Sequence, residues 1–187
     1  LHGDELKVAF AFLLTMPGAP FIYYGDEIGL RYVENLVSVE GGYNRTGSRS
    51  PMQWNHSVNF GFSNASPEKL YIPTDDKPNS PTVEDQMADP ASLYYEVKKL
   101  IALRRAHSAL LSDGDIEFVS DGADGAPLAY IRSSADEKIL VIINPADKEA
   151  VLEVPGIWNE SLYTVGGTVK AENGKWIISP KSANVLR

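Results

Sequence analysis

The sequence contains no cysteine, which excludes a disulfide framework, a thiol nucleophile and a thiolate metal site. No apolar run approaches the length of a transmembrane helix, and no signal peptide is recognisable. Positive charge is also scarce: the sequence has 17 Lys and Arg residues but 25 Asp and Glu residues, which gives a net charge of −8. This balance argues against a nucleic acid or an anionic membrane surface as the partner.

Motifs for metals and cofactors are missing as well. The three histidines are too dispersed to form a ligand cluster, and there is no calcium loop and no phosphate-cradling glycine motif. We therefore expect neither a metal nor a cofactor. The chain opens on Leu1 rather than Met, so we expect it to be a piece of a longer protein, and its compartment stays open. With 187 residues and 43% hydrophobic residues, it can bury a substantial core in one large or two small domains.

Residues 5–16 predict a helix that is apolar nearly all round, and Asp4 is its expected N-cap. Such a helix has to be covered on most sides. Pro17 and Gly18 end it. Residues 20–24 form a short run rich in bulky β-formers, which predicts a buried strand. Helix, tight turn and buried strand together make one αβ unit of a parallel fold.

Two carboxylates, Asp26 and Glu27, stand where this expected strand ends, directly after Gly25. Ligands collect at the carboxyl ends of parallel strands, so the position predicts a site. Residues 30–89 show little periodicity but carry scattered aromatic residues. We expect an ordered loop, because a disordered segment would be poorer in aromatics. Whether each ring anchors the loop or binds a ligand is left open.

A second helix is expected from Pro90 to about residue 107, with Asp89 as its N-cap. Its expected buried stripe consists of Leu93, Val97, Leu100 and Ile101. The cations of its last turn, Arg104, Arg105 and His107, would meet the negative end of the helix dipole and need no functional explanation.

The texture of the chain changes after Leu111. Short β-type runs follow at 116–120, 127–132, 138–144, 149–154, 161–165, 175–179 and 184–187. Turn residues separate them, and Asn173-Gly174 is the strongest hairpin signal among these. Many short strands with closely spaced turns predict an all-β antiparallel sandwich.

Several motifs carry a resemblance to a known family. TMPGAPFIYYGDEIGL (residues 15–30) is followed by GSRSPMQW (47–54), GFS (61–63), VEDQ (83–86), DP (89–90) and LIALRRAHSAL (100–110). This series resembles the α-amylase superfamily, glycoside hydrolase family 13, in its oligo-1,6-glucosidase, α-glucosidase and trehalose synthase branch. The resemblance implies that residues 1–111 are the C-terminal part of a catalytic (β/α)8 barrel: its seventh helix, eighth strand, a loop and its eighth helix. It also implies that residues 112–187 form the C-terminal β-sandwich domain.

Asp26 and Glu27 are poor candidates for a catalytic pair. Retaining glycosidases place two carboxyl groups about 5–5.5 Å apart across the scissile bond. Adjacent residues leaving a strand point to opposite faces and cannot do this. The resemblance implies the same, since the family's nucleophile, acid/base and transition-state-stabilising carboxylates lie on earlier strands. We expect no catalytic residue here, and Asp26 and Glu27 either form ion pairs in the barrel mouth or shape the acceptor side of a substrate site.

Arg49 is the best candidate for substrate binding. A guanidinium group can hold a carboxylate bidentately or donate to vicinal sugar hydroxyls. In family members with an Arg-x-Pro-Met-Gln-Trp motif, this arginine pairs with an early-barrel Asp to hold the non-reducing-end glucose, and the motif falls on Arg49 here. The alternative is that Arg49 only staples the loop to the barrel; Arg45 lacks the motif context. Residues 51–54 are interpreted as the anchor of the loop, with Trp54 packed rather than stacked on sugar.

The leading hypothesis is the C-terminal portion of a retaining enzyme that acts on α-glucans or α-glucosides, of the α-glucosidase or oligo-1,6-glucosidase type. The chain alone would be inactive, because the catalytic carboxylates lie upstream. One alternative is a trehalose synthase, an isomerase on the same scaffold, and another is a non-catalytic carbohydrate-binding or structural module. The expected small-molecule partner is an α-linked glucose disaccharide or oligosaccharide. The expected macromolecular partner is the remainder of the barrel or a second copy, because the strand at 20–24 would otherwise expose two unpaired edges.

Overall fold

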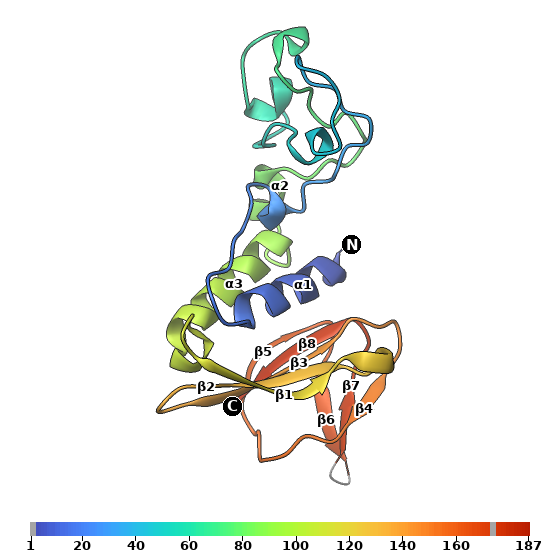
Figure 1. Ribbon diagram of the computed structural model, residues 1–187. Coiled ribbons are helices and arrows are strands. Elements are labelled where there is room, and N and C mark those ends of the chain that lie inside the picture. The colour runs from blue at the N-terminus through green and yellow to red at the C-terminus, as the bar shows by residue number, and fades with distance from the viewer. Residues whose placement is uncertain (1–2, 173–174) are drawn as a thin grey trace. The chain divides into compact units, whose positions relative to one another are not determined.

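The computed structural model describes residues 3–172 and 175–187 (Figure 1). The chain divides into two compact units, one made of residues 1–21 and 96–187 and the other of residues 22–95. The first unit contains both β-sheets and a helix from the start of the chain. The second unit is mostly loop and carries the candidate site.

The first unit is built on a five-stranded antiparallel sheet with the strand order β1-β2-β3-β8-β5. Its strands are β1 (Asp115–Asp121), β2 (Leu128–Ser133), β3 (Lys138–Asn144), β8 (Ser182–Leu186) and β5 (Ser161–Val165). A three-stranded antiparallel sheet in the order β4-β7-β6 consists of β4 (Ala150–Leu152), β7 (Lys175–Ile178) and β6 (Val169–Glu172). The prediction of antiparallel sheets is confirmed. The expected turn at Asn173-Gly174 lies outside the described residues.

The two sheets pack face to face through a buried apolar cluster. Leu140, Ile142 and Leu186 contribute to it from the larger sheet, and Ile178 contributes from the smaller one. Partly buried rings and aliphatic side chains, among them Trp176, close the cluster at its margin. Removing this apolar surface from water is the main favourable term that joins the sheets.

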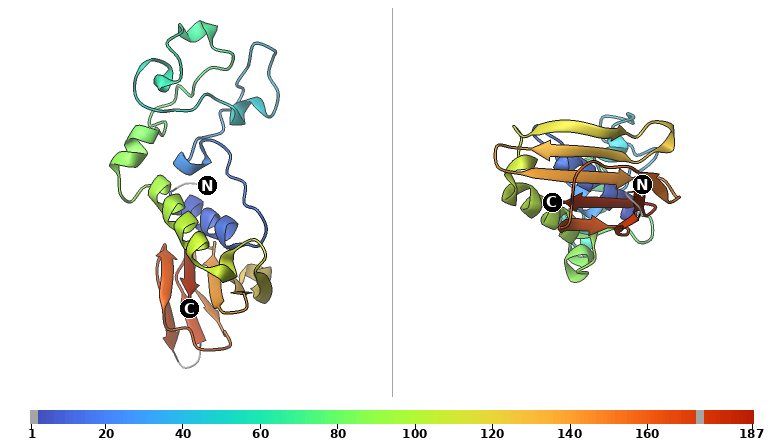
Figure 2. Two further views of the ribbon diagram at one scale, coloured as in Figure 1. Left: turned by 90° about the vertical axis from the view of Figure 1, so that its left-hand side faces the viewer. Right: turned by 90° about the horizontal axis from the view of Figure 1, so that it is seen from below.

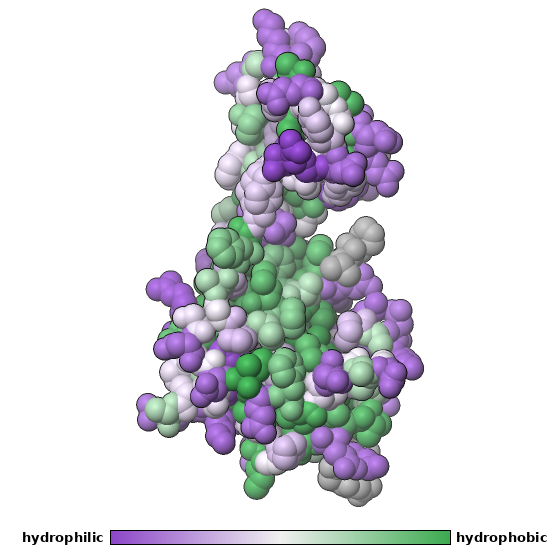
Figure 3. All heavy atoms as spheres, in the orientation of Figure 1, coloured by the Kyte–Doolittle hydropathy of each residue, from purple (hydrophilic) through white to green (hydrophobic). Residues whose placement is uncertain are grey.

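The opposite face of the larger sheet is covered by α1 (Asp4–Thr15), which lies against β3, β8 and β5 (Figures 1 and 2). β3 is therefore covered on both faces, which explains why residues 139–144 are all buried. A strand covered on one face would alternate apolar and polar residues, whereas residues 139–143 of β3 (ILVII) form an unbroken apolar run. The residues of α1 that are buried are Val8, Phe10, Ala11, Leu14 and Thr15. Apolar side chains also show on its outer side, where Phe12 is 40% exposed (Figure 3).

Two buried arginines hold the C-terminal end of α1. Arg104 donates to the carbonyl oxygens of Leu14 and Met16 at 2.8 and 2.7 Å, and to that of Gly18 at 2.6 Å. Arg132, which is fully buried, donates to the Thr15 carbonyl and to three carbonyls at residues 111, 114 and 115. Burial lowers the pKa of both guanidinium groups, because it disfavours their charged form. Both arginines donate hydrogen bonds to carbonyl groups in the last turn of α1, which the end of a helix leaves without intrahelical partners.

Several helix predictions need correction. α1 begins at Asp4, so this residue lies in the first turn rather than at the N-cap, where Gly3 stands without a side-chain cap. α3 (Leu93–Ala106) begins three residues after Pro90, because a separate short helix, α2 (Val83–Ala88), precedes it and is capped by Thr82. Ile101 was expected in the buried stripe of this helix but is 38% exposed, whereas Leu93, Val97 and Leu100 are buried.

The interpretation of the last-turn cations was also wrong in part. The guanidinium group of Arg104 donates to carbonyl oxygens at and just after the end of α1, rather than lying at the C-terminal end of its own helix dipole. His107 forms a 2.7 Å contact from Nδ1 to Glu137 Oε1. Burial acts to raise the pKa of Glu137, but hydrogen bonds from His107 and from the Ala109 N–H outweigh it and leave the pKa lowered.

The strand expected at residues 20–24 is not formed. The segment has no regular secondary structure up to Tyr23, no strand among the described residues pairs with it, and Phe21 is 88% exposed. The physical reason is that a strand exists only through hydrogen bonds to a neighbour, which local sequence preference cannot supply.

We expect Arg104→Ala to lower the free energy of unfolding by about 2–4 kcal/mol, because it strips three buried or partly buried carbonyls of a charged donor. Arg104→Lys should recover only part of the loss, since one ammonium cannot reproduce the planar fork. Urea titration followed by circular dichroism measures the change. Arg105→Ala is the matched control, because Arg105 is exposed and should shift the value by about 0.5 kcal/mol or less. Equal effects of the two alanine variants would contradict the assignment.

Candidate functional site

The unit of residues 22–95 is organised by short turns of 3-10 helix rather than by sheets. They are η1 (Asp26–Ile28), η2 (Thr46–Ser48), η3 (Val58–Gly61) and η4 (Pro67–Lys69). The residues singled out from the sequence lie on or beside the first two of these turns. The aromatic residues of this loop are mostly about half exposed, namely Tyr32, Tyr43, Trp54, Phe62 and Tyr71.

Gly25 creates the turn that positions the two carboxylates. It adopts the left-handed conformation with φ of 88°, and a Cβ there would lie 2.1 Å from the Leu30 side chain. The Tyr23 N–H donates to Asp26 Oδ2 at 3.0 Å, so Asp26 closes the turn from an exposed position. Glu27 lies further inside, and its Oε2 atom is enclosed without a hydrogen-bond partner. Within the described part of the chain, neither carboxylate forms an ion pair.

The RSPMQW segment follows η2 and is buried from Ser50 to Gln53. The Tyr24 hydroxyl donates to the Ser50 carbonyl at 3.1 Å, and this hydrogen bond ties the RSPMQW segment to the residues just before η1. Gln53 is fully buried, and neither polar atom of its side chain has a partner among the described residues. An unpaired buried amide is costly, and such costs are tolerated mainly at functional sites.

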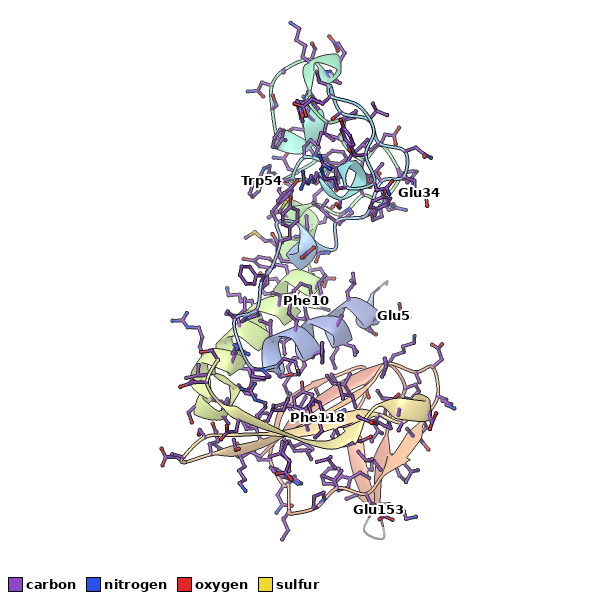
Figure 4. All side chains as sticks on the ribbon, in the orientation of Figure 1. Glu5, Phe10, Glu34, Trp54, Phe118 and Glu153 are labelled. Atoms are coloured by element: carbon purple, nitrogen blue, oxygen red, sulfur yellow. The ribbon has the colours of Figure 1, made fainter. Side chains whose placement is uncertain are left out.

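Trp54 is not packed as expected. Its ring is 49% exposed and projects from the loop (Figure 4), while its backbone N–H donates to the Phe60 carbonyl at 2.9 Å. The anchoring role therefore belongs to residues 51–53 and to the backbone of Trp54. Its ring is left free to contact something else.

A cavity of about 470 Å³ opens in this unit, within the size range of small-molecule sites. Its lining residues are Tyr24, Glu27, Arg49, Pro51, Met52, Trp54, Phe62, Tyr71 and Ile72. The structure therefore brings Arg49 and Glu27 to one cavity and leaves Asp26 and Arg45 outside it. Most of the wall is aromatic or aliphatic, and one cation and one anion provide its charged groups.

The charged groups of the cavity are available for a ligand. Arg49 is exposed and has no hydrogen bond or ion pair to any residue that the structure describes. Burial raises the pKa of the Tyr24 phenol, the neighbouring Tyr23 adds to the rise, and the positive charge of Arg49 opposes it. The raised pKa keeps the Tyr24 phenol neutral at neutral pH, and the side chains of Arg49 and Glu27 line the same cavity. This set suits a neutral, hydroxyl-rich molecule better than an ion of either sign.

An ion pair between a partly exposed arginine and a buried aspartate, missed from the sequence, joins two distant parts of this unit. Arg31 donates from Nε and Nη2 to Asp75 Oδ2 at 2.9 and 2.7 Å, and Asp75 is 1% exposed. Ser80 accepts from the same guanidinium at 2.7 Å. The pair joins the start of the loop to the segment that follows Tyr71 and Ile72. Nothing in the local pattern of the sequence signalled a partner 44 residues away.

A second pair lies on the surface of the same unit. His56 Nε2 lies 2.9 Å from both carboxylate oxygens of Asp85, and Thr82 donates to Asp85 Oδ2 at 2.8 Å. The hydrogen bond to Asp85 raises the pKa of His56, and the same bond lowers that of Asp85.

No group of three or more metal-ligating side chains occurs among residues 3–172 and 175–187. Over those same residues, no helix is both long and apolar enough to cross a membrane.

The model of the α-amylase catalytic domain matches residues 2–114. The chain belongs to the α-amylase family. Both the RSPMQW segment and the Glu27 turn lie within the matched part. The family assignment made from the motifs is therefore confirmed.

Curated relatives of this α-amylase family chain include enzymes of different types. Trehalose synthase of Pimelobacter sp. is 36% identical over 149 residues, covering 75% of this chain and 25% of the relative. Glucan 1,6-alpha-glucosidase of Streptococcus pneumoniae is 35% identical over 183 residues, covering 83% and 33%. Oligo-1,6-glucosidase of Parageobacillus thermoglucosidasius is 29% identical over 180 residues, covering 81% and 31%. The chain thus spans about a quarter to a third of the length of these relatives.

Solved structures confirm the fold at lower identity. Trehalulose synthase from Pseudomonas mesoacidophila has a TM-score of 0.82 at 20% identity, over 98% of this chain and 38% of that one. Isomaltulose synthase from Klebsiella sp. has a TM-score of 0.80 at 21% identity over the same shares. At this identity the similarity speaks for the fold alone.

We expect Arg31→Ala to destabilise the unit of residues 22–95 by about 3 kcal/mol, because it leaves the Asp75 carboxylate buried without its partner. Trp54 fluorescence during urea titration reports on this unit, read in variants that keep Trp54 but replace Trp158 and Trp176 by Phe. Arg45→Ala is the matched control, since Arg45 is exposed and only stacks on the Tyr43 ring at 4.8 Å. A double variant, Arg31→Met with Asp75→Leu, should recover much of the loss. No recovery would show that the pair matters for more than its charges.

Proposed function

We propose that the chain is the C-terminal portion of an enzyme that acts on α-glucosidic bonds, of the α-glucosidase or oligo-1,6-glucosidase type. The observation that carries this proposal is the cavity in which Arg49 and Glu27 meet a half-exposed aromatic wall. A sugar has hydroxyl groups at its edge and apolar C–H groups on its faces, and the cavity offers partners for both. Family membership and the glucosidase relatives support the choice of an α-glucoside.

In this proposal Arg49 donates to hydroxyl groups of the non-reducing-end glucose, and the carboxylate of Glu27 accepts from hydroxyls on the acceptor side. Both groups lack partners among the described residues of the chain, so a sugar would not have to displace existing bonds. Asp26 belongs to the turn that presents Glu27, and it contributes to the acceptor side only from the cavity's rim. The catalytic nucleophile and acid/base come from outside this chain, on the remainder of a barrel.

We assign residues 1–111 to that barrel and residues 112–187 to a sandwich domain behind it. The remainder of the barrel, or a second copy of the chain, would then cover the extended segment at residues 20–24 and the exposed apolar side of α1.

A second candidate is a trehalose synthase, because relatives bearing that name match as well as the glucosidases do. The two reactions separate in their products: a hydrolase releases only glucose from maltose, whereas the isomerase also forms trehalose. A third candidate is a non-catalytic sugar-binding or structural module. The presence of the catalytic carboxylates in the full-length gene would distinguish an enzyme from such a module.

Arg49→Ala in the full-length protein, as its gene encodes it, should lower kcat/KM for an α-glucoside roughly 30- to 4,000-fold, which corresponds to a free-energy cost of about 2–5 kcal/mol. The loss arises because no other cation lines the cavity to replace the lost donor. Arg49→Lys should also be poor, since the planar fork is lost although the charge remains. Arg45→Ala is the control with nearly normal kinetics. Near-normal activity of Arg49→Lys with unchanged KM would contradict the role of a substrate clamp.

The 187-residue chain by itself should not hydrolyse an aryl α-glucoside, because Arg49 can position a sugar but cannot replace a nucleophile and an acid. The measurement is the release of the chromophore by the purified chain over many hours, against a buffer blank. Turnover that disappears in Asp26→Asn or Glu27→Gln would assign catalysis to these carboxylates and overturn their proposed binding role.

A further inference from the structure

A histidine and an aspartate on the surface of the second unit join a turn to a helix. The turn spans residues 54–62, and His56 is its only titratable side chain. His56 Nε2 lies 2.9 Å from both carboxylate oxygens of Asp85, which belongs to α2. Histidine is the side chain that changes its charge near neutral pH, so the charge of this turn is set by His56.

The 54–62 turn needs support from outside, because its backbone is strained. Asn59 and Phe60 both lie in the left-handed region, with φ of 51° and 54°, which residues other than glycine rarely adopt. Inside the turn, the Phe60 carbonyl accepts from the backbone N–H groups of residues 54 and 55 at 2.9 and 3.2 Å. Backbone strain of this kind persists only where surrounding contacts hold it in place.

The helix that carries Asp85 supplies this support. The Thr82 hydroxyl donates to Asp85 Oδ2 at 2.8 Å and accepts from the Asp85 N–H at 3.1 Å, so the carboxylate is fixed by the N-terminal cap of α2. Two backbone N–H groups in the first turn of α2 donate to the carbonyls of Gln53 and Trp54 at 2.9 and 3.0 Å. Backbone hydrogen bonds therefore attach the start of the turn to α2, and the contact of His56 adds a tie that depends on charge.

We propose that His56 and Asp85 form a protonation-dependent clamp that positions the 54–62 turn and, with it, part of the cavity wall. Trp54 and Phe62 are the two ends of this turn, and both line the cavity, whereas His56 and Asp85 do not. His56 is therefore a positioning residue that acts through the turn. The clamp goes beyond the proposed function, because it concerns the control of the wall by pH, and only its kinetic test rests on that function.

The direction of the pH dependence follows from the groups that face His56. They are Asp85 and, as a smaller influence, Glu84, and both belong to α2. The hydrogen bond and the charge of Asp85 raise the pKa of His56, and the bond from His56 lowers the pKa of Asp85. The ion pair is therefore complete from the lowered pKa of Asp85 up to about pH 6.5, the ordinary pKa of histidine. It is lost as the pH rises through the raised pKa of His56, because Asp85 stays ionised there.

Hydrogen exchange of the full-length protein, as its gene encodes it, tests the clamp without any substrate. The exchange rates of the backbone amides of residues 58–62 are compared between the wild type and His56→Gln at the same pH, so that the pH dependence of intrinsic exchange cancels. At about pH 5.5 the variant should exchange roughly 2- to 5-fold faster, the value of one exposed ion pair. At about pH 8.5 the two proteins should exchange equally, because neither carries a charge at residue 56.

Two further variants separate the charge of His56 from its structural role. His56→Lys keeps a cation at both pH values and should retain the slow exchange at about pH 8.5. His107→Gln is the matched control and should leave residues 58–62 unchanged, because His107 also contacts a carboxylate, that of Glu137 at 2.7 Å, but in the other unit. Equal exchange of the wild type and His56→Gln at about pH 5.5 would overturn the clamp. Exchange in His56→Lys as fast as in His56→Gln would overturn the role of the charge.

Kinetics with an α-glucoside test the link between the clamp and the cavity. The quantity measured is the ratio of KM in His56→Gln to KM in the wild type, in which the titration of the shared catalytic groups cancels. This ratio should be about 2 to 5 at about pH 5.5 and about 1 at about pH 8.5, with kcat little changed, because the turn holds the wall and not the reacting groups. The same ratio at both pH values would overturn the positioning role. If the wild type turns over no α-glucoside, the proposed function fails, and the exchange measurement still decides whether the clamp exists.

Discussion

The first unit of the structure depends on two guanidinium groups that serve carbonyl oxygens instead of carboxylates. Arg104 on α3 and Arg132 on β2 converge on the last turn of α1, at carbonyls of residues 14–18. Charged donors in a low-dielectric interior make strong hydrogen bonds, but each one costs desolvation, which the lowered pKa values express. The result is that a helix from the start of the chain is locked to a sheet that begins a hundred residues later.

The second unit follows a different logic. Its residues form few regular hydrogen-bond ladders, so its shape comes from left-handed turns, from buried polar side chains and from the Arg31–Asp75 pair. This scaffold leaves polar groups of Glu27 and Gln53 enclosed without described partners, and it leaves aromatic rings half exposed. In a segment optimised for stability alone, the enclosed polar groups would have hydrogen-bond partners and the aromatic rings would be buried.

Local patterns in the sequence predicted what is decided locally. All seven expected β-runs overlap observed strands, since alternation, apolar runs and turn residues act over a few positions. Arg49 was placed by its motif, and the structure brings it to the cavity. Long-range contacts were not predictable: Arg104 was assigned to its own helix, Trp54 was expected to be packed, and the Arg31–Asp75 pair left no signal. The strand at residues 20–24 failed for a related reason, because pairing belongs to the sheet and not to the segment.

The double covering of β3 has a consequence for how such chains can evolve and be recombined. Its side chains at residues 139, 141 and 143 meet α1, while those at 140 and 142 meet the smaller sheet. If the sandwich were replaced by that of a distant homologue, the outer face of its larger sheet would meet an α1 of different sequence. The side chains of the two surfaces would then pack poorly against each other. We therefore expect substitutions in α1 and in the outer face of the larger sheet to be correlated in evolution, although nearly a hundred residues of loop and helix separate the two along the chain.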